Sequence, residues 1–175
     1  YQEILTDPSY RGQIVTMTAP EMGNTGANQD DLECERPHLA GFVVHALSKI
    51  ASNWRSLTTL DEHLKQHQVV GIAGVDTRAL TRHLRDHGAQ MAALGSASVD
   101  TLLASAKAAP PMTGRDLTLE VTTKRVYEWT QGTGMWKLNA NAAAKHHVVA
   151  IDFGVKRSIL SCLVDAGCKV TVVPA

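Results

Sequence analysis

The sequence carries no net charge, because 17 lysines and arginines are balanced by 17 aspartates and glutamates in 175 residues. Such a chain has no long-range field that gathers phosphates, so we expect neither nucleic acid nor an anionic membrane as its main partner. It also lacks a signal-peptide pattern and any apolar run near the roughly 18 residues that span a bilayer. These absences predict a cytoplasmic protein.

Aromatic residues are scarce, at 5% of the chain, whereas hydrophobic residues of all kinds make up 44%. That hydrophobic fraction is typical of globular proteins and argues against wholesale disorder. The sequence therefore predicts a packed core built mainly from aliphatic side chains.

Cysteine is also scarce, and the three that occur form an odd number without the close pairs of a metal site. They are Cys34, Cys162 and Cys168. A nucleophilic thiol needs a base within hydrogen-bond reach and often a sharp strand-to-helix turn, and no cysteine has this setting in the sequence. Cys34 lies between Glu33 and Glu35, whose charge disfavours a thiolate, and Cys162 shares a helical face with Ile159. We expect three reduced, structural thiols, with Cys162 as a small core residue.

Apolar periodicity over the first 130 residues or so predicts a mixture of strands and helices. Strands are expected at 13–19, 40–46 and 69–73, and an extended segment at 121–127. Helices are expected at 59–67 with a Thr59–Glu62 capping box, at 76–88 with Asp76 as its cap and Gly88 as its stop, and at 98–107. The side chains expected to face the core from the last two helices are Leu80, Leu84, Leu102, Leu103 and Ala106.

A different pattern follows an irregular stretch that contains glycine and predicts a linker at 133–146. Beyond it, β-branched runs at 148–151 and 170–173 flank a helix with apolar residues at helical spacing. These are Ile159, Leu160, Leu163 and Val164. The pattern predicts a βαβ unit with parallel strands and a right-handed crossover. The predicted fold class is therefore α/β, with one domain over 1–132 and a second that begins at 147.

Both ends of the chain look cut. Tyr1 is not a methionine and opens a structured pattern, and the chain stops directly after the second strand of the βαβ unit. Two parallel strands covered by one helix are marginal on their own. We therefore expect a fragment of a longer protein.

Two histidine pairs could hold a metal, because residues four apart share a helix face. The pairs are His63 with His67 and His83 with His87. Neither has the intervening glutamate of a metalloprotease motif, and both have charged neighbours. Solvated surface is the favoured interpretation.

The first turn of the βαβ unit reads DFGVKR, with one glycine, Gly154, where a dinucleotide site uses three. We therefore do not expect nucleotide binding there. Lys156 and Arg157 could receive an anion at the start of the following helix, although a solvated helix end is the commoner arrangement.

Ser9 follows Asp7 and Pro8 in a turn. Its hydroxyl would ordinarily bond a nearby backbone amide. The same hydroxyl could accept a hydrogen bond from an ammonium group or donate one to a carboxylate, as the binding of a free amino acid requires. The residues alone leave both roles open.

Six segments that cover nearly the whole chain resemble the small-subunit family of glutamine-dependent carbamoyl phosphate synthetases. They read YQEILTDPSY, GQIVTMTAPEMGNTGAN, GFVVHALSKIASNWRS, VVGIAGVDTRALTRHLRDHGAQ, EVTTKRVYEWTQG and VVAIDFGVKRSILSCLVDAGCKVTVVPA. The resemblance implies a first domain that packs against a large subunit. It implies a second domain of the class I glutamine amidotransferase type, with a flavodoxin-like parallel sheet.

The resemblance also implies an activity for the whole subunit. In this family a cysteine, backed by a histidine and a glutamate, hydrolyses L-glutamine, and the ammonia passes to the large subunit. That subunit makes carbamoyl phosphate from bicarbonate and ATP for arginine and pyrimidine synthesis. No cofactor or metal is implied for this chain, whereas ATP and a divalent metal are implied on the large subunit.

Ser9 is the one substrate-binding residue that the resemblance implies here, because it matches the family serine that contacts glutamine. The family's nucleophile motif, a cysteine flanked by glycines two positions away on each side, is absent from the sequence. We therefore expect no catalytic triad in this chain, and a non-catalytic scaffold or subunit-interface module is the alternative. Three places depart from the family: the GAQMAALGS stretch, Cys34 where serine is usual, and His45 where arginine is frequent.

Overall fold

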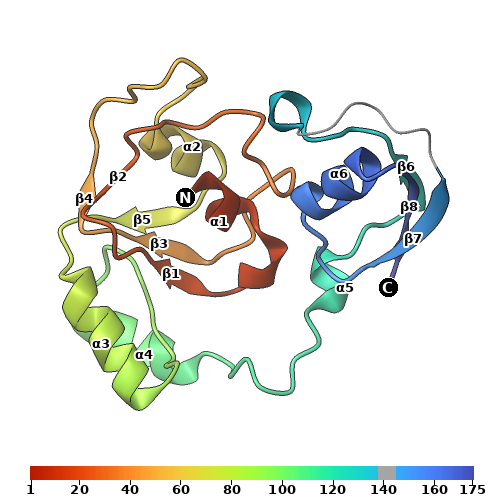
Figure 1. The fold of residues 1–175 in the computed structure, drawn as a ribbon. Coiled ribbons are helices and arrows are strands. Elements are labelled where there is room, and N and C mark those ends of the chain that lie inside the picture. The colour runs from red at the N-terminus through yellow and green to blue at the C-terminus, as the bar shows by residue number, and fades with distance from the viewer. Residues whose placement is uncertain (138–144) are drawn as a thin grey trace.

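The computed structural model describes residues 1–137 and 145–175, which form two units, each with its own sheet and core (Figure 1). The first unit runs from the N-terminus through helix α4 (Val99–Ala108), helix α5 (Thr118–Val121) follows it, and the second unit begins at strand β6 (Tyr127–Trp129). Parallel strands combined with helices make the fold α/β, which confirms the predicted class. The predicted domain boundaries stay a prediction. No helix in the described ranges is long and apolar enough to cross a membrane.

A parallel sheet of three short strands, in the order β1–β3–β5, organises the first unit. The strands are β1 (Ile14–Thr16), β3 (Gly41–Val43) and β5 (Val70–Ile72). Each lies within a predicted strand. A second parallel pair, β2 (Glu21–Met22) with β4 (Ala46–Leu47), follows the ends of β1 and β3. The predicted strand at 40–46 is therefore split, and its central part, β3, is fully buried.

The core of the first unit joins this sheet to helix α1 (Gln2–Thr6) and helix α2 (Leu60–Gln66). Its most deeply buried side chains are Leu5, Phe42 and Leu60. These residues come from three distant parts of the chain, so the core fixes how α1 and α2 lie on the sheet.

Helix α2 begins with the predicted capping box. The hydroxyl of Thr59 accepts a hydrogen bond from the Glu62 amide at 3.2 Å, and the Glu62 carboxylate accepts one from the Thr59 amide at 2.9 Å. Helix α3 (Thr77–His87) likewise begins with the Asp76 cap and ends at Gly88, whose φ of 79° is left-handed. Both predictions are confirmed, because a cap depends on residues within one helical turn.

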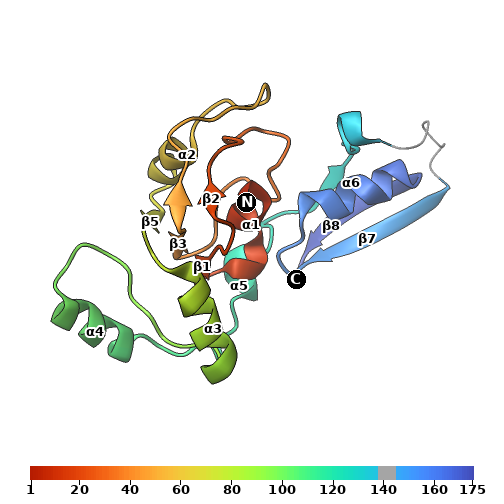
Figure 2. The same cartoon turned by 60° about the vertical axis from the view of Figure 1, so that its left-hand side comes forward.

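Burial on α3 and α4 differs from the prediction. Leu80 and Leu84 are half-buried, and Leu103 on α4 is 50% exposed, so the predicted burial of α4 is wrong. Figure 2 shows both helices standing away from the sheet. Leu102 and Ala106 on α4 are half-buried, and a methyl carbon of Leu102 lies 3.6 Å from the position that a Cβ atom on Gly95, in the loop before α4, would take. Helical spacing shows which side chains share a face, but it does not show whether another element covers that face.

The predicted extended segment at 121–127 is also wrong for most of its length. The chain forms the short helix α5 and then a bend, and strand β6 starts at Tyr127. The bend is held by the amide of Thr123, which donates to the Asp152 carboxylate at 2.7 Å. This partner is distant in sequence, so local propensity could not reveal it.

The second unit has a three-stranded sheet in the order β6–β8–β7. Strand β7 (His146–Asp152) and strand β8 (Cys168–Pro174) are parallel and are joined by helix α6 (Arg157–Asp165), which confirms the predicted βαβ unit. Strand β6 pairs with β8 in the antiparallel sense, with Trp129 opposite Val170. The sequence predicts two strands in this sheet, and the structure adds a third, β6, which precedes the predicted linker in the chain.

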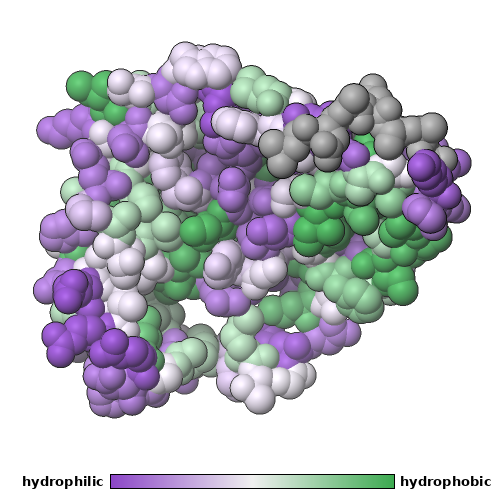
Figure 3. All heavy atoms as spheres, in the orientation of Figure 1, coloured by the Kyte–Doolittle hydropathy of each residue, from purple (hydrophilic) through white to green (hydrophobic). Residues whose placement is uncertain are grey.

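Helix α6 covers one face of this sheet, and its Leu160 packs against Val170 and Val172. On the other face, the apolar side chains of Val149 and Ile151 are exposed, as is Phe153 directly after β7. Figure 3 shows hydrophobic surface over the second unit, at the right of the view.

Cys162 is exposed, so its predicted burial is wrong. Ile159, with which it shares a helical face, is itself 51% exposed, because the buried side of α6 is the side that carries Leu160.

The predicted linker at 133–146 lies partly outside the described residues, which omit 138–144. Before that gap the chain forms a short 3₁₀ helix, η2 (Gly134–Trp136). Asp165 at the end of α6 accepts hydrogen bonds from the amide of Thr133 at 2.9 Å and from its hydroxyl. The start of the predicted linker is thus attached to the second unit.

Candidate functional site

The turn that carries Ser9 is stabilised without the serine hydroxyl. The 3₁₀ helix η1 (Pro8–Tyr10) starts at Asp7, whose carboxylate accepts a hydrogen bond from the Ser9 amide at 2.8 Å. Gln13 donates to the Ser9 carbonyl at 3.1 Å. The side chain of Ser9 is exposed, and its hydroxyl forms no hydrogen bond to any of the described residues. The ordinary role of a turn serine is filled by Asp7, and the Ser9 hydroxyl is available to a ligand.

The Ser9 turn lies against the carboxyl end of β7. Gly154, in the loop after β7, has a φ of 93°, and a Cβ atom placed on it would lie 3.0 Å from the Pro8 Cβ and 3.2 Å from a methyl carbon of Val121. The glycine of the DFGVKR turn therefore allows a close approach between the two units. The carboxyl ends of parallel strands are the usual place for ligands in α/β sheets.

Asp152 shapes this loop from the last position of β7. One oxygen of its buried carboxylate accepts from the amides of Gly154 and Val155 at 2.9 and 2.8 Å, and the other accepts from the amide of Thr123. The carboxylate thus joins the strand end, the following turn and the segment before β6. Sequence reasoning missed this residue, although an aspartate directly before a glycine turn is a recognised turn-forming signal.

Lys156 bridges the two units. Its ammonium nitrogen lies 3.6 Å from an oxygen of Asp7 and 3.6 Å from an oxygen of Glu33. Burial alone would lower the pKa of Lys156, but attraction to Glu33 and then to Asp7 outweighs it and raises the pKa above its ordinary value. Lys156 is therefore charged at neutral pH and neutralises carboxylates of the first unit.

Arg157 also has partners in this chain. Its guanidinium lies 3.7 Å from Glu35 and 5.9 Å from the ring of Trp129. The sequence suggested that Lys156 and Arg157 could receive an anion at a helix start. In the structure both cations face carboxylates, which does not favour anion binding.

Glu33 occupies the start of helix α6 from the opposite unit. Its carboxylate, in a side chain only 5% exposed, accepts from the Ser158 amide at 2.9 Å and from the Ser158 hydroxyl at 2.7 Å. The Glu33 carbonyl accepts from the Arg157 amide at 3.1 Å. Lys156, at the N-cap position, supplies no side-chain cap. The sequence signal for this contact was a predicted helix without a capping residue of its own.

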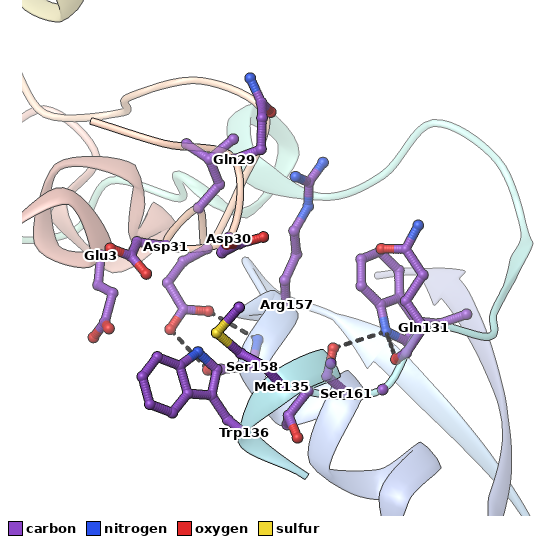
Figure 4. A pocket seen from close by; sticks show the side chains of 16 residues that line it. Glu3, Gln29, Asp30, Asp31, Gln131, Met135, Trp136, Arg157, Ser158 and Ser161 are labelled. Atoms are coloured by element: carbon purple, nitrogen blue, oxygen red, sulfur yellow. Dashed lines mark hydrogen bonds between the residues drawn. The ribbon is translucent and has the colours of Figure 1, made fainter. Parts of the chain in front are cut away.

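Beside this contact lies a cleft of about 340 Å³ between the 29–33 loop and helix α6 (Figure 4). Asp30 and Asp31 line one side, Trp136 lines another, and Arg157 lies across from the two aspartates. Both aspartates form ion pairs with Arg55, at 3.7 and 2.9 Å. Ser9 does not line this cleft, so the structure separates the cleft from the site expected from the sequence.

The structure corrects two predictions, one about a thiol and one about a histidine. Cys34 does have a base within reach, because its sulfur lies 3.4 Å from Nε2 of His38. His63 is buried rather than solvated, because it follows Leu60 by one helical turn. Burial, followed by the neighbouring His67, lowers the pKa of His63.

A metal site finds no support in the part of the chain that the structure describes. The rings of His83 and His87 stack on exposed α3, 4.3 Å apart. Across residues 1–137 and 145–175, no group of three or more potential ligands has the arrangement of a metal site.

Comparison with known proteins decides the family. Residues 1–94, more than half of the chain, match the family model of the carbamoyl-phosphate synthase small chain, CPSase domain. The chain belongs to this family. Among similar proteins are the carbamoyl phosphate synthase small chains of Syntrophotalea carbinolica, 54% identical, of Yersinia pseudotuberculosis, 52% identical, and of a Nostoc species, 50% identical. Each alignment covers the whole of this chain and 47–48% of the relative. This member of the carbamoyl phosphate synthase small-chain family thus spans about half the length of the curated relatives it matches.

The family model covers the Ser9 turn and Glu33. Gly154, Lys156 and Ser158 lie beyond residue 94 and are covered only by the alignments with the relatives, which span the whole chain. The resemblance found in the sequence is therefore confirmed as family membership, and the role of Ser9 stays a prediction.

Proposed function

We propose that this chain is part of the glutamine-hydrolysing small subunit of a carbamoyl phosphate synthetase and that it supplies Ser9 to the glutamine site. The observation that supports this most directly is the exposed Ser9 hydroxyl, held beside the carboxyl end of β7 by contacts that leave it unused. A hydroxyl in that position can accept from the ammonium group of glutamine or donate to its carboxylate.

The proposed reaction requires a nucleophilic thiol and a base that no motif in this chain supplies. A base takes the proton of a thiol, the thiolate attacks the glutamine amide carbon, and the protonated base gives that proton to the leaving ammonia. Water then hydrolyses the resulting thioester to glutamate and restores the thiol, and backbone amides stabilise the oxyanion in both steps. The sequence has no cysteine in the family's glycine-flanked motif, so we assign these roles to the part of the subunit that this chain does not span. Here Ser9 binds the substrate, and Asp7 and Pro8 orient Ser9.

The partner in this proposal is the large synthetase subunit. It takes up the ammonia and makes carbamoyl phosphate from bicarbonate and ATP, with a divalent metal on that subunit. The product would enter arginine and pyrimidine synthesis in the cytoplasm. The names of the relatives support the small-subunit role.

The test uses the full-length subunit, in complex with its large subunit, with Ser9→Ala. Loss of a hydrogen bond to a charged group costs about 1.5–3 kcal/mol, so we expect the KM for glutamine to rise at least tenfold and kcat to change much less. Ser105→Ala, which removes a hydroxyl from the exposed side of α4, is the matched control. Synthesis from free ammonia should be unaffected in both variants. An unchanged KM in Ser9→Ala would remove Ser9 from the site.

The alternative is a non-catalytic scaffold or interface module, which the missing nucleophile motif favours for the 175-residue polypeptide by itself. A glutaminase assay on this polypeptide, with its mass verified as 18.9 kDa, separates the two. We expect no turnover from it, whereas turnover would show that catalytic groups are present here.

A further inference from the structure

We propose that Glu33 is a positioning residue of the glutamine site: by capping helix α6 across the unit boundary, it fixes the end of β7 against the Ser9 turn. This inference rests on the proposed function. Glu33 lies outside the family's catalytic motif, and its role follows from contacts between the two units.

The contact at the start of α6 replaces a missing local cap. The first amides of a helix have no partner within the helix, and a side chain at the N-cap position usually accepts from them. Lys156 occupies that position and cannot accept. Glu33 accepts from the Ser158 amide and hydroxyl with its two carboxylate oxygens, at 2.9 and 2.7 Å, and its carbonyl accepts from the Arg157 amide. A negative charge at this end of the helix also suits the helix dipole.

Burial makes the contact specific. Because the Glu33 side chain is 5% exposed, water cannot replace its partners easily. The glutamine of E33Q can still accept from the Ser158 amide and donate to the Ser158 hydroxyl, but it carries no charge, and its N–H group stands beside the Lys156 ammonium. The start of α6 therefore loses the charge-assisted part of its hydrogen bonds and the ion pair with Lys156.

The same carboxylate is linked to the Ser9 turn. Lys156 lies 3.6 Å from Glu33 and 3.6 Å from Asp7, and Asp7 holds the Ser9 amide at 2.8 Å. The loop between β7 and α6 carries Gly154, which packs directly on Pro8. A shift of α6 would therefore change the distance between the end of β7 and the Ser9 hydroxyl. A substrate bound by both units would lose affinity.

The experiment measures glutamine hydrolysis by the full-length subunit in complex with its large subunit, with E33Q and with E35Q as the matched control. Glu35 is the next acidic residue, and it is 88% exposed with one long ion pair. We expect E33Q to raise the KM for glutamine about tenfold, as expected for one lost charged hydrogen bond, with kcat within about twofold. E35Q should match the unmodified protein in both constants.

A double-mutant cycle with Ser158→Ala tests the contact itself. If Glu33 acts through Ser158, the KM of E33Q/S158A rises by less than the product of the two single increases. If E33Q fails to fold, the comparison is made with E33D against E35D, where the shorter side chain keeps the charge but cannot span both partners.

Each outcome is decisive. An unmodified subunit that does not hydrolyse glutamine overturns the proposed function, and this inference falls with it. An active subunit in which the Glu33 variants keep the KM of their Glu35 controls, even with a lower melting temperature, assigns Glu33 a structural role only. Independent effects of E33Q and S158A on KM also overturn the proposal.

Discussion

Gln68 adopts a left-handed backbone conformation, with φ of 56°, directly after helix α2. Its amide donates to the Lys65 carbonyl at 3.1 Å, and the amide of Val69 donates to the Leu64 carbonyl at 2.9 Å. These are the two hydrogen bonds of a Schellman motif, in which the residue after the cap is usually glycine. Gln68 therefore fills a glycine position at an energetic cost.

Gln68→Gly should stabilise the protein by about 1 kcal/mol, because glycine avoids the steric cost of the left-handed region. Gln66→Gly, inside α2, should instead destabilise it by about 1 kcal/mol. The midpoint of urea unfolding measures both changes. Equal effects of the two substitutions would contradict this explanation.

Gly154 is required for two reasons, its left-handed φ and its contact with Pro8. We expect Gly154→Ala to destabilise the protein by about 3 kcal/mol, from backbone strain and overpacking together. Gly74→Ala is the matched control, because Gly74 has a φ of 86° and nothing lies within 4 Å of the position that a Cβ atom would take there. That variant should lose only about 1 kcal/mol in urea unfolding. Similar losses would show that the contact with Pro8 is loose.

At the scale of single elements, the capping box of α2 predicts a pH dependence. Hydrogen bonds from the Thr59 amide and then from the Thr58 and Thr59 hydroxyls lower the pKa of Glu62 below its ordinary value of 4.5. A carboxylate whose pKa is depressed by folding stabilises the folded state at every pH above its pKa in the unfolded chain. That stabilisation is lost as the pH falls through the pKa of the folded state.

Glu62→Gln should therefore flatten the fall in stability between about pH 5 and pH 3. Glu21→Gln, at an exposed position on β2, should leave that fall unchanged. Thermal unfolding over this pH range measures the difference. A Glu62→Gln profile parallel to that of the unmodified protein would exclude a role for the cap.

The same elements show how far sequence reasoning reaches. The starts of α2 and α3 were predicted correctly because Thr59 and Asp76 act on amides three residues away. The burial of Leu103 was predicted wrongly, because burial requires another element to cover that face of α4, and helical spacing does not show whether one does. In the candidate site, the turn at Ser9 was predictable, but its place beside β7 was not. Glu33 was missed because its partner, Ser158, is 125 positions away.

At the scale of the whole molecule, the two cores are built from different side chains within residues 1–137 and 145–175. Leu160 belongs to the core of the second unit and Leu64 to that of the first. Hydrogen bonds and ion pairs around Glu33, Lys156 and Ser158 connect the units, together with the packing of Gly154 on Pro8. The units should therefore open separately when one core is weakened.

Leu160→Ala should cost the second unit about 3 kcal/mol by leaving a cavity. Hydrogen exchange measured by mass spectrometry should then increase in β7 and β8 and stay unchanged in β1 and β3. Leu64→Ala is the reciprocal control, with faster exchange expected in the first unit. A uniform increase across both units would show that the molecule opens as one body.

The position of strand β6 also determines where two related subunits can be joined in a chimeric protein. Because β6 precedes the predicted linker but pairs with β8, a gene fusion joined within that linker would leave β8 without its antiparallel neighbour. The exposed edge would carry unpaired amides and carbonyls beside the apolar Val170 and Val172, a known template for aggregation. A chimera that exchanges the second unit between relatives should therefore be joined before Tyr127, so that the strand travels with its sheet.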